Sequence, residues 1–483
     1  MTMIGHRDTG SLSTPATEPW FDSLSQAWHT MTSLRGSLPA PTRQAHSPGL
    51  AGAVGILRDA LYLPGPSGQR RVPSAGAIFP YTTLVLAHEQ HECGAAGWSL
   101  FRVSADGRVT DLPADRALTS RLARSFQPAV DERLTHLLVL NRPWMSIRKY
   151  GPRGYLYSRL DAAHALVNLL GIALETRDAW LQLSCGGEDT EDLLVDQARY
   201  HELCGVVSMR GTDGDTAADG GTAVEVADAV ALAGSVDPPD GDTLEAACWS
   251  LLGDLVRQGA PRRPAVTVAA PHSTAPAEAE HDLRLAGRWS QASAMRRSTR
   301  RFGGPAIEID RIAAALSALG TQLPTSLQPG GASEIEVTVF VPNALASEAE
   351  LHRQLGRYGR VVAPKATDRS DITAACMGQQ HLREAQAFVL VSASRRRLLY
   401  EGRAQFEETL FRAGASGQLM YLGSARAGVG ITTVGGFDSA RWSEMARLPE
   451  DHELLYLAAL GNEAASSAPK LDRDAAALTH GER

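Results

Sequence analysis

The chain has 483 residues, of which 43% are hydrophobic and 21% are charged, so it can bury a large core. That balance excludes a disordered chain, a collagen-like repeat and a coiled coil. Lysine and arginine total 47 against 54 aspartates and glutamates, which gives a net charge of -7. A mildly acidic chain without a long basic block is a poor candidate for binding nucleic acid through its phosphates.

The N-terminus and the cysteines favour a soluble, cytoplasmic protein without a metal site. The opening MTMIGHRDTGSLSTP lacks the apolar core of a signal peptide, and no apolar run reaches the length of a membrane span. The five cysteines are scattered and form no Cys-x-x-Cys pair. His88 and His91 are three residues apart, whereas the helix of a zinc protease needs a spacing of four.

Composition divides the chain into two comparable halves with connecting and terminal segments. Residues 1–45 are rich in Ser, Thr and Pro and are expected to form an N-terminal extension, while residues 464–483 form a flexible tail. Residues 211–285 are expected to be a linker with one short helix over Leu244–Arg257. The two halves are then residues 46–210 and residues 286–463.

The same order of elements is predicted in both halves. In the first half, apolar residues spaced three and four apart predict a helix over Leu160–Leu174, between two pairs of strands. These strands are Thr83–Ala87, Thr135–Leu140, Trp180–Leu183 and Leu203–Met209. The second half begins with a helix over Ile309–Leu319 and then repeats the order, with its long helix over Phe406–Met420. Its strands are Ile335–Val341, Phe388–Val391, Gly430–Val434 and Leu454–Leu460. We therefore predict an α+β fold built by internal duplication.

Three segments could approach a flat, phosphate-bearing ligand. Arg70–Pro80, RRVPSAGAIFP, places small residues between two prolines, which makes a rigid turn with accessible backbone amides. Arg296–Phe302, RRSTRRF, offers forked guanidinium donors and a hydroxyl suited to phosphate. Gly428–Asp438, GVGITTVGGFD, has paired glycines that let a backbone pass beside a ring. Each segment alone is more typical of an ordinary turn, basic loop or bulge.

In this order, the three segments resemble the FMN-dependent nitroreductase superfamily. RRSTRRF is similar to the phosphate-binding signature of that family, and GVGITTVGGFD to its late glycine-rich signature. VPSAGAIFPYTTLVL is similar to the branch that dehydrogenates azolines in ribosomally made peptides. In that branch a Lys-Tyr pair is implicated in catalysis, and Lys149-Tyr150 lies between this segment and the long helix, which carries Asp161, His164 and Asn168.

The resemblance implies a set of site residues. Lys149 and Tyr150 would be catalytic. The FMN phosphate would be held by Arg296, Arg297, Ser298 and Arg300, and the ring would be flanked by Pro73, Ser74, Ala75, Gly76, Gly435 and Gly436. A lysine base needs a lowered pKa, for which Arg148 and Arg153 are candidate neighbours.

Neither half carries a complete set of motifs. The first half lacks a convincing Arg-Arg-Ser signature, and Cys185–Asp189 is only a faint echo of the late signature. The second half has Gln328–Ala332 in place of the Pro-Ser-Ala-Gly-Ala segment and Leu399-Tyr400 in place of Lys-Tyr. Because members of the superfamily are usually homodimers with flavin at the interface, the resemblance implies an intramolecular pseudo-dimer with one competent FMN site.

The implied function is the oxidation of thiazoline or oxazoline rings to thiazoles or oxazoles in a ribosomally synthesised peptide natural product, such as an antibiotic. The partners would be an azoline-bearing precursor peptide and a cyclodehydratase, and dioxygen would be the simplest final acceptor. Two alternatives stay open. One is another flavin oxidoreductase on this scaffold, acting on carrier-bound or cyclic dipeptide substrates or on nitro compounds. The other is a flavin-free binding protein.

Overall fold

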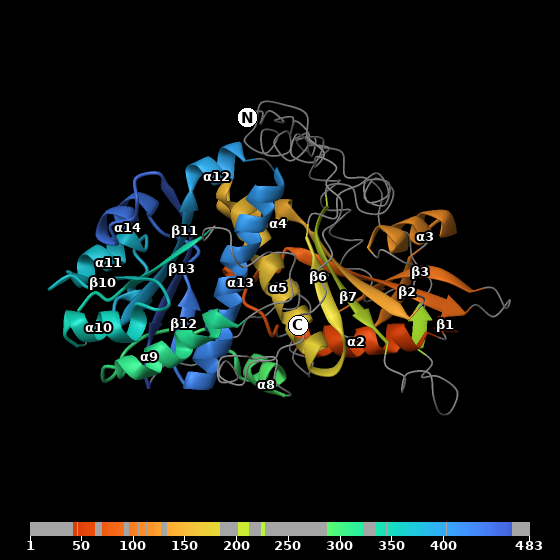
Figure 1. Ribbon diagram of the computed structural model, residues 1–483, viewed down its shortest axis with the longest axis horizontal. Helices are drawn as coiled ribbons and strands as arrows, with labels where there is room; N and C mark the ends of the chain where they lie inside the picture. Colours follow the sequence, from red (N-terminus) through yellow and green to blue (C-terminus); the bar gives the residue numbers. More distant parts are fainter. Residues whose placement is uncertain are drawn as a thin grey trace, which may run out of the picture.

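The computed structural model of the chain contains two β-sheets, with two long helices side by side between them (Figure 1). The second-half sheet lies on the left of Figure 1 and the first-half sheet on the right. This architecture confirms the predicted α+β class. The structure describes residues 42–45, 47–62, 70–90, 96–104, 107–112, 114–126, 133–183, 201–211, 224–227, 287–321, 335–343, 346–401 and 403–465.

The first sheet has eight strands in the order β1-β8-β4-β3-β2-β5-β7-β6. Their bounds are β1 Thr42–Ala45, β2 Tyr81–Gln90, β3 Ala96–Val103, β4 Val109–Leu112, β5 Leu134–Asn141, β6 Ala179–Gln182, β7 Glu202–Arg210 and β8 Val224–Ala227. The central strand β5 is buried along its whole length, which agrees with its apolar sequence. The four predicted strands of this half are β2, β5, β6 and β7.

Four helices accompany the first sheet. They are α2 Pro48–Leu61, α3 Arg116–Ser125, α4 Pro143–Tyr150 and α5 Arg153–Thr176. Ser47 and Asp115 cap α2 and α3 through their side chains, and proline occupies the first turn of α2 and of α4. Nearly all residues of α5 are buried, which explains why its apolar pattern is readable from the sequence.

The second sheet has five strands in the order β10-β9-β11-β13-β12. Their bounds are β9 Glu336–Phe340, β10 Arg360–Val362, β11 Ala387–Ser394, β12 Gly430–Thr433 and β13 His452–Gly461. The helices are α8 Arg288–Met295, α9 Ile309–Leu316, α10 Glu348–Leu355, α11 Arg369–Ala375, α12 Arg395–Tyr400, α13 Arg403–Ala427 and α14 Ser439–Met445. The four predicted strands are observed here too, and the order β9-β11-β13-β12 matches β2-β5-β7-β6 of the first sheet.

The long helices α5 and α13 contact each other at equivalent positions. They end at Thr176 and Ala427, so equivalent residues are 427 − 176 = 251 apart. The rings of Tyr155 and Phe406, one such pair, are parallel to within 9° with centroids 6.3 Å apart. Ala163 and Gly414 are a second pair, since a methyl group on Gly414 would lie 2.6 Å from the Cβ of Ala163. Contact between equivalent positions is what packing about a local twofold axis produces.

Asn168 of α5 joins the two halves by a buried network of hydrogen bonds. Its amide nitrogen donates to the Oγ of Ser293 at 2.9 Å and to the carbonyl of Ala60. Its amide oxygen accepts from the indole of Trp289 at 2.7 Å and from Gln418 at 3.1 Å. The side chain of Asn168 therefore links residues of α8 and α13 to the first half.

Some predicted segments lie outside the described residues, and two segments predicted as connectors contain strands of the first sheet. The expected helix Leu244–Arg257, the segment Gln328–Ala332 and the segment Cys185–Asp189 lie outside the described residues. The strands β1 and β8 lie within the segments predicted as extension and linker, and they form the edge of the first sheet.

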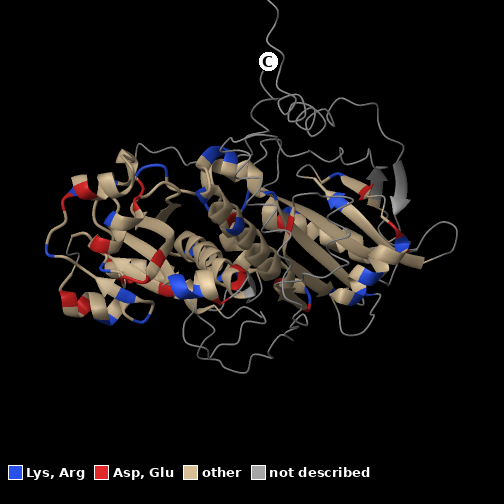
Figure 2. Cartoon of the chain, turned by 90° about the horizontal axis from the view of Figure 1, so that it is seen from above, with Lys and Arg blue, Asp and Glu red and all other residues tan. Residues whose placement is uncertain are grey.

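In the described part of the chain, none of the helices is both long and apolar enough to cross a membrane. Charged residues of both signs are interspersed over the two halves (Figure 2).

A Gly→Ala change at the contact between α5 and α13 should have the opposite effect on stability from a Gly→Ala change at an open position of α2. Gly414→Ala should destabilise the protein by about 1–3 kcal/mol, because the added methyl group meets Ala163 and the carbonyl of Leu160. Gly55→Ala within α2, where the added methyl group meets nothing within 4 Å, should stabilise it by about 0.5–1 kcal/mol through helix propensity. Urea unfolding of both variants checks this, and a stabilised Gly414→Ala would contradict the packing.

Candidate functional site

The Pro-Ser-Ala-Gly-Ala segment forms a turn in an uncommon backbone conformation. Gly76, Ala77 and Phe79 all have positive φ, of +62°, +56° and +50°. Such conformations persist in non-glycine residues only where the surroundings hold them. The Oγ of Ser74 donates to Asp161 at 2.5 Å and accepts from the amide of Phe79 at 2.8 Å, which ties both ends of the turn.

Lys149 and Tyr150 form the last residues of α4 and lie over this turn. The helix ends there because Gly151 follows with a φ of +59°. The ammonium of Lys149 is 3.4 Å from the carbonyl oxygen of Gly76. A side chain at position 76 would displace the ammonium and the hydroxyl of Tyr150, and the φ of +62° also favours glycine at this position.

The two residues of the pair differ in exposure. Lys149 and Arg148 are both exposed to solvent. Arg153 was a second candidate neighbour, but it donates instead to the carbonyl of Phe437 and the hydroxyl of Ser439. Tyr150 is half-buried, and burial, helped by the charge of Asp161, raises its pKa to about 12. Tyr150 is therefore a neutral phenol at physiological pH.

Lysine is rare in this chain. Of its 47 basic side chains, only Lys149, Lys365 and Lys470 are lysines, and the other 47 − 3 = 44 are arginines. A guanidinium stays protonated in proteins, whereas an amine can release its proton and act as a base. The choice of lysine at position 149 is thus a signal that residue counting alone could have found.

Gly435 and Gly436 of the second half form the opposite wall. A methyl group on Gly435 would lie 3.9 Å from the Cβ of Ala75, so the bend that follows β12 lies beside the turn. Tyr157 of α5 donates to the carbonyl of Gly435, and Gln379 donates to the carbonyl of Gly436 at 2.6 Å. Sequence reasoning missed Tyr157 and Gln379, which are distant in sequence from both glycines and belong to no motif.

The arginine motif divides into buried and exposed members. The guanidinium of Arg296 donates to the carbonyls of Arg71 at 2.7 Å and Arg70 at 3.1 Å, so it fastens the second half to the segment before the turn. Ser298 is buried, with its Oγ 3.0 Å from the hydroxyl of Tyr421. Arg297 and Arg300 are exposed, which leaves them as the members best placed for an incoming anion.

His164 connects the turn to the second sheet. Its Nδ1 lies 3.4 Å from the carbonyl of Pro73, and its Nε2 lies 3.1 Å from the hydroxyl of Tyr456 on β13. Because a carbonyl can only accept, Nδ1 carries the proton and Nε2 accepts from the phenol. Complete burial lowers the pKa of His164 to about 3, which keeps this bridge neutral.

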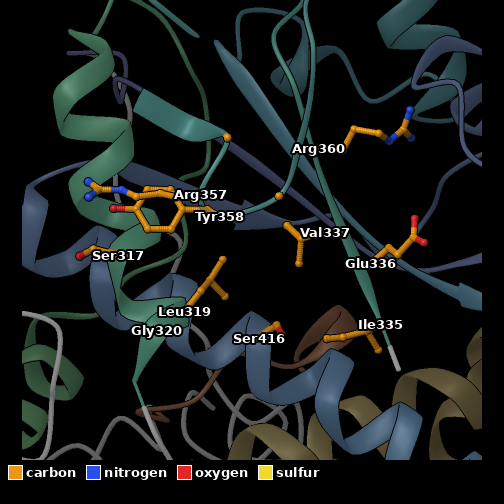
Figure 3. Close-up of a pocket in the computed structure, with 12 residues that line it drawn as sticks. Ser317, Leu319, Gly320, Ile335, Glu336, Val337, Arg357, Tyr358, Arg360 and Ser416 are labelled. Atoms are coloured by element: carbon orange, nitrogen blue, oxygen red, sulfur yellow. The ribbon is translucent and has the colours of Figure 1, made fainter. Parts of the chain in front are cut away.

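A cavity of about 690 Å³ lies elsewhere in the second half, between the 3-10 helix Ser317–Gly320 that follows α9, the strand β9 and the helix α13 (Figure 3). Its lining includes Ser317, Val337, Tyr358, Arg360 and Ser416 and none of the predicted site residues. It lies beside the start of β9, the counterpart of β2, and the segment that precedes β9 is outside the described residues. The cavity is therefore separate from the candidate site.

Residues 294–462 match a family model described as the nitroreductase family. The matched residues make up less than half of the chain and are similar to that family. They include the arginine motif and both glycines of the second wall. No curated protein matches the chain significantly.

Solved structures show that the fold extends beyond the matched residues. A candidate nitroreductase from Anabaena variabilis ATCC 29413 is similar with a TM-score of 0.59 and 16% identity, covering 91% of this chain and 99% of that one. A candidate nitroreductase from Ralstonia eutropha JMP134 is 20% identical, with a TM-score of 0.25, and covers 41% of this chain and 90% of that one. NfrA1 nitroreductase from B. subtilis is 16% identical, with a TM-score of 0.27, and covers 37% and 68%. The first of these likenesses shows a shared fold across both halves.

The donors of the candidate site suit FMN, which members of the nitroreductase family generally use. Arg297 and Arg300 provide exposed cationic donors for a phosphate. Gly76 and the two glycines of the second wall provide backbone without side chains. A flat ring between two walls separates them by about twice the carbon contact distance of ~3.5 Å. A ring between Ala75 and Gly435 therefore requires these two residues to lie farther apart than in this structure.

The buried histidines predict a loss of stability in acid. The pKa of His164 is about 3 in the folded chain, against an ordinary value of 6.5, so between these values only the unfolded chain binds the proton. The free energy of unfolding should therefore fall as pH falls through this window, by about 2 kcal/mol from pH 7.5 to pH 5 for this residue. His164→Gln should remove that loss from urea titrations at the two pH values.

His136 offers a matched comparison in the first half. Burial lowers its pKa to about 3 as well, and its Nδ1 contacts Ser208 rather than the turn. His136→Gln should remove a similar part of the stability that is lost in acid. The double variant should remove the sum of the two losses in the free energy of unfolding. A wild-type pH dependence in His164→Gln would show that this histidine is not buried in the neutral form.

Proposed function

We propose that the chain is an FMN-dependent dehydrogenase that oxidises thiazoline or oxazoline rings of a precursor peptide to thiazoles or oxazoles. Its partners would be that azoline-bearing peptide and the cyclodehydratase that forms the rings. The observation that carries the proposal is the position of Lys149 and Tyr150 over Gly76, in a turn that touches Gly435 of the second half. A proton acceptor thus lies beside the expected ring site.

We further propose that the two halves act as an intramolecular pseudo-dimer with one FMN site. Contacts between equivalent positions of α5 and α13 support the local twofold axis. Only the first half has the Lys-Tyr pair, and only the second has the arginine motif. At the counterpart position on α12, Leu399 and Tyr400 are 67% and 80% exposed to solvent among the described residues.

The residues of the chain would divide the binding of FMN. Arg297 and Arg300 would hold the phosphate, while the turn Ser74–Ala77 and the bend Gly435–Gly436 would flank the ring. Arg296 would act mainly by fastening the two halves together, because its donors bond backbone carbonyls. Bound FMN would supply the two-electron acceptor for the reaction.

The proposed reaction removes two hydrogens from adjacent carbons of the azoline ring. One leaves as a hydride with both electrons of its C–H bond, and the other leaves as a proton, so a second ring double bond forms. Lys149 would accept the proton at Nζ in its neutral amine form, from an exposed position that can reach a ring presented from solvent. Tyr150, a neutral phenol, would orient the lysine or pass the proton on. Dioxygen would be the final oxidant.

Removal of the base tests this function. Lys149→Ala should fold and retain FMN but slow flavin bleaching by a thiazoline peptide by about a hundred- to ten-thousand-fold, the usual effect of losing a positioned base. Anaerobic single-turnover mixing measures this step without reoxidation. Lys365→Ala, the same change at an exposed lysine of the second half, should bleach at the wild-type rate.

The outcomes separate the candidate functions. Tyr150→Phe should be milder if the phenol only orients the lysine, and equally severe if it relays the proton. If Lys149→Ala bleaches its flavin at the wild-type rate, Lys149 is not the proton acceptor. If the wild type is not bleached by azoline peptides but is bleached by another reductant class, the broader flavin oxidoreductase takes precedence.

The arginine motif predicts how FMN is retained. Each chain should hold one FMN, and Arg300→Ala should weaken its retention by about 1.5–3 kcal/mol without lowering stability, since this side chain is exposed. Arg296→Ala should lower both retention and stability, because it also frees two carbonyls. Arg301→Ala, an exposed neighbour, is the control. FMN released on denaturation, measured against protein, checks this, and two per chain would contradict it.

A further inference from the structure

We infer that Asp161 is a positioning residue that holds the Ser74–Ala77 turn beneath Lys149 and Tyr150. This inference deepens the proposed function and rests on it. It assigns to α5 the task of fixing the floor of the site, against which the reacting ring would be placed.

Asp161 contacts two consecutive residues of the turn. Its carboxylate is buried and accepts from the Oγ of Ser74 at 2.5 Å. Both carboxylate oxygens lie 3.2 Å from the amide of Ala75. Charge-assisted hydrogen bonds of this kind are about twice as strong as neutral ones, so this carboxylate is a main anchor of the turn.

The contact with Ser74 extends through the whole turn. A hydroxyl has one proton, and when Ser74 gives it to Asp161, a lone pair is left for the amide of Phe79. Loss of the acceptor at Asp161 would let this hydroxyl rotate and would release both amides. The left-handed residues between them, Gly76 and Ala77, would then lose the contacts that hold their conformation.

Asp161 also lies within electrostatic reach of the catalytic pair. After burial itself, the charge of Asp161 is the largest cause of the raised pKa of Tyr150. The backbone of Gly76 lies close to the ends of the Lys149 and Tyr150 side chains, since a Cβ there would meet both. The position of the turn therefore determines the space available to these two side chains. A small shift of the turn would therefore displace the acceptor relative to the ring, and a misplacement of 1 Å can cost about 100-fold in rate.

Glu175 provides a matched control on the same helix. It accepts from the amides of Trp289 and Ser290 and from the hydroxyl of Ser290, the same kinds of donor that Asp161 receives. It lies fourteen residues along α5 from Asp161, about 21 Å at 1.5 Å per residue. Glu175→Gln thus removes a comparable anchor of α5 without touching the turn.

The test compares Asp161→Asn, Ser74→Ala and Glu175→Gln in the full-length, FMN-loaded protein. Hydrogen exchange of the segment 72–80, followed by mass spectrometry, reports the turn without any need for activity. Steady-state kinetics with a synthetic peptide carrying one thiazoline report kcat and KM. Asp161→Asn and Ser74→Ala should each speed exchange at least tenfold and lower kcat about 10- to 100-fold, with KM changed less than threefold.

The double variant and the control decide between positioning and plain stabilisation. Combining Asp161→Asn with Ser74→Ala should lower kcat by less than the product of the two single effects, because both changes remove the hydrogen bond between Ser74 and Asp161. Glu175→Gln should lower the melting temperature but leave the exchange of the turn and kcat as in wild type. Wild-type exchange in Asp161→Asn, additive effects on kcat, or an equal loss of kcat in Glu175→Gln would overturn the inference. If wild type does not oxidise the peptide, the proposed function fails, and exchange alone still decides whether Asp161 holds the turn.

Discussion

The candidate site depends on the packing of α5 against α13. These helices approach closely because Gly414 faces Ala163 with no side chain between them. Their contact carries the first turns of α5 to the second sheet, where Arg153 and Tyr157 reach the carbonyls of Phe437 and Gly435. This packing places the Ser74–Ala77 turn of the first half beside Gly435 and Gly436 of the second half.

Buried charge restricts the way in which the halves dock. Arg159 of α5 lies 3.0 Å from Glu407 of α13 and 3.5 Å from Glu202 of β7, and all three are largely buried. Removing one partner of such a cluster leaves an uncompensated charge and typically costs about 3–5 kcal/mol. A sliding of α13 along α5 would separate Arg159 from Glu407, so the cluster favours one register of the two helices.

The sequence predicted the parts of this molecule that depend on local pattern. The strands β2, β5, β9 and β11 and the helices α5 and α13 follow from apolar periodicity, because each buries most of its residues. The short strands β1 and β8, at one end of the first sheet, were not predicted, since four residues carry too little alternation of apolar and polar side chains. The proximity of Gly76 to the Lys-Tyr pair followed only from the family resemblance.

The supporting contacts could not be predicted, because they join residues far apart in sequence. The bonds of Arg296 to Arg70 and Arg71 cross more than two hundred residues, and a motif predicts a guanidinium donor without naming its acceptor. The same holds for Asp161, whose partners in the turn are 86 and 87 residues away. These contacts exist only once α5 is packed between the turn and α13.

A crystal structure of the full chain grown with FMN and a thiazoline peptide would test the central claim most directly. The account predicts the FMN ring between the Ser74–Ala77 turn and Gly435–Gly436, with Gly435 farther from Ala75 than in the structure described here and Lys149 facing the thiazoline. FMN bound in the cavity beside Tyr358, or within the second half without contact to the first half, would contradict a site built from both halves.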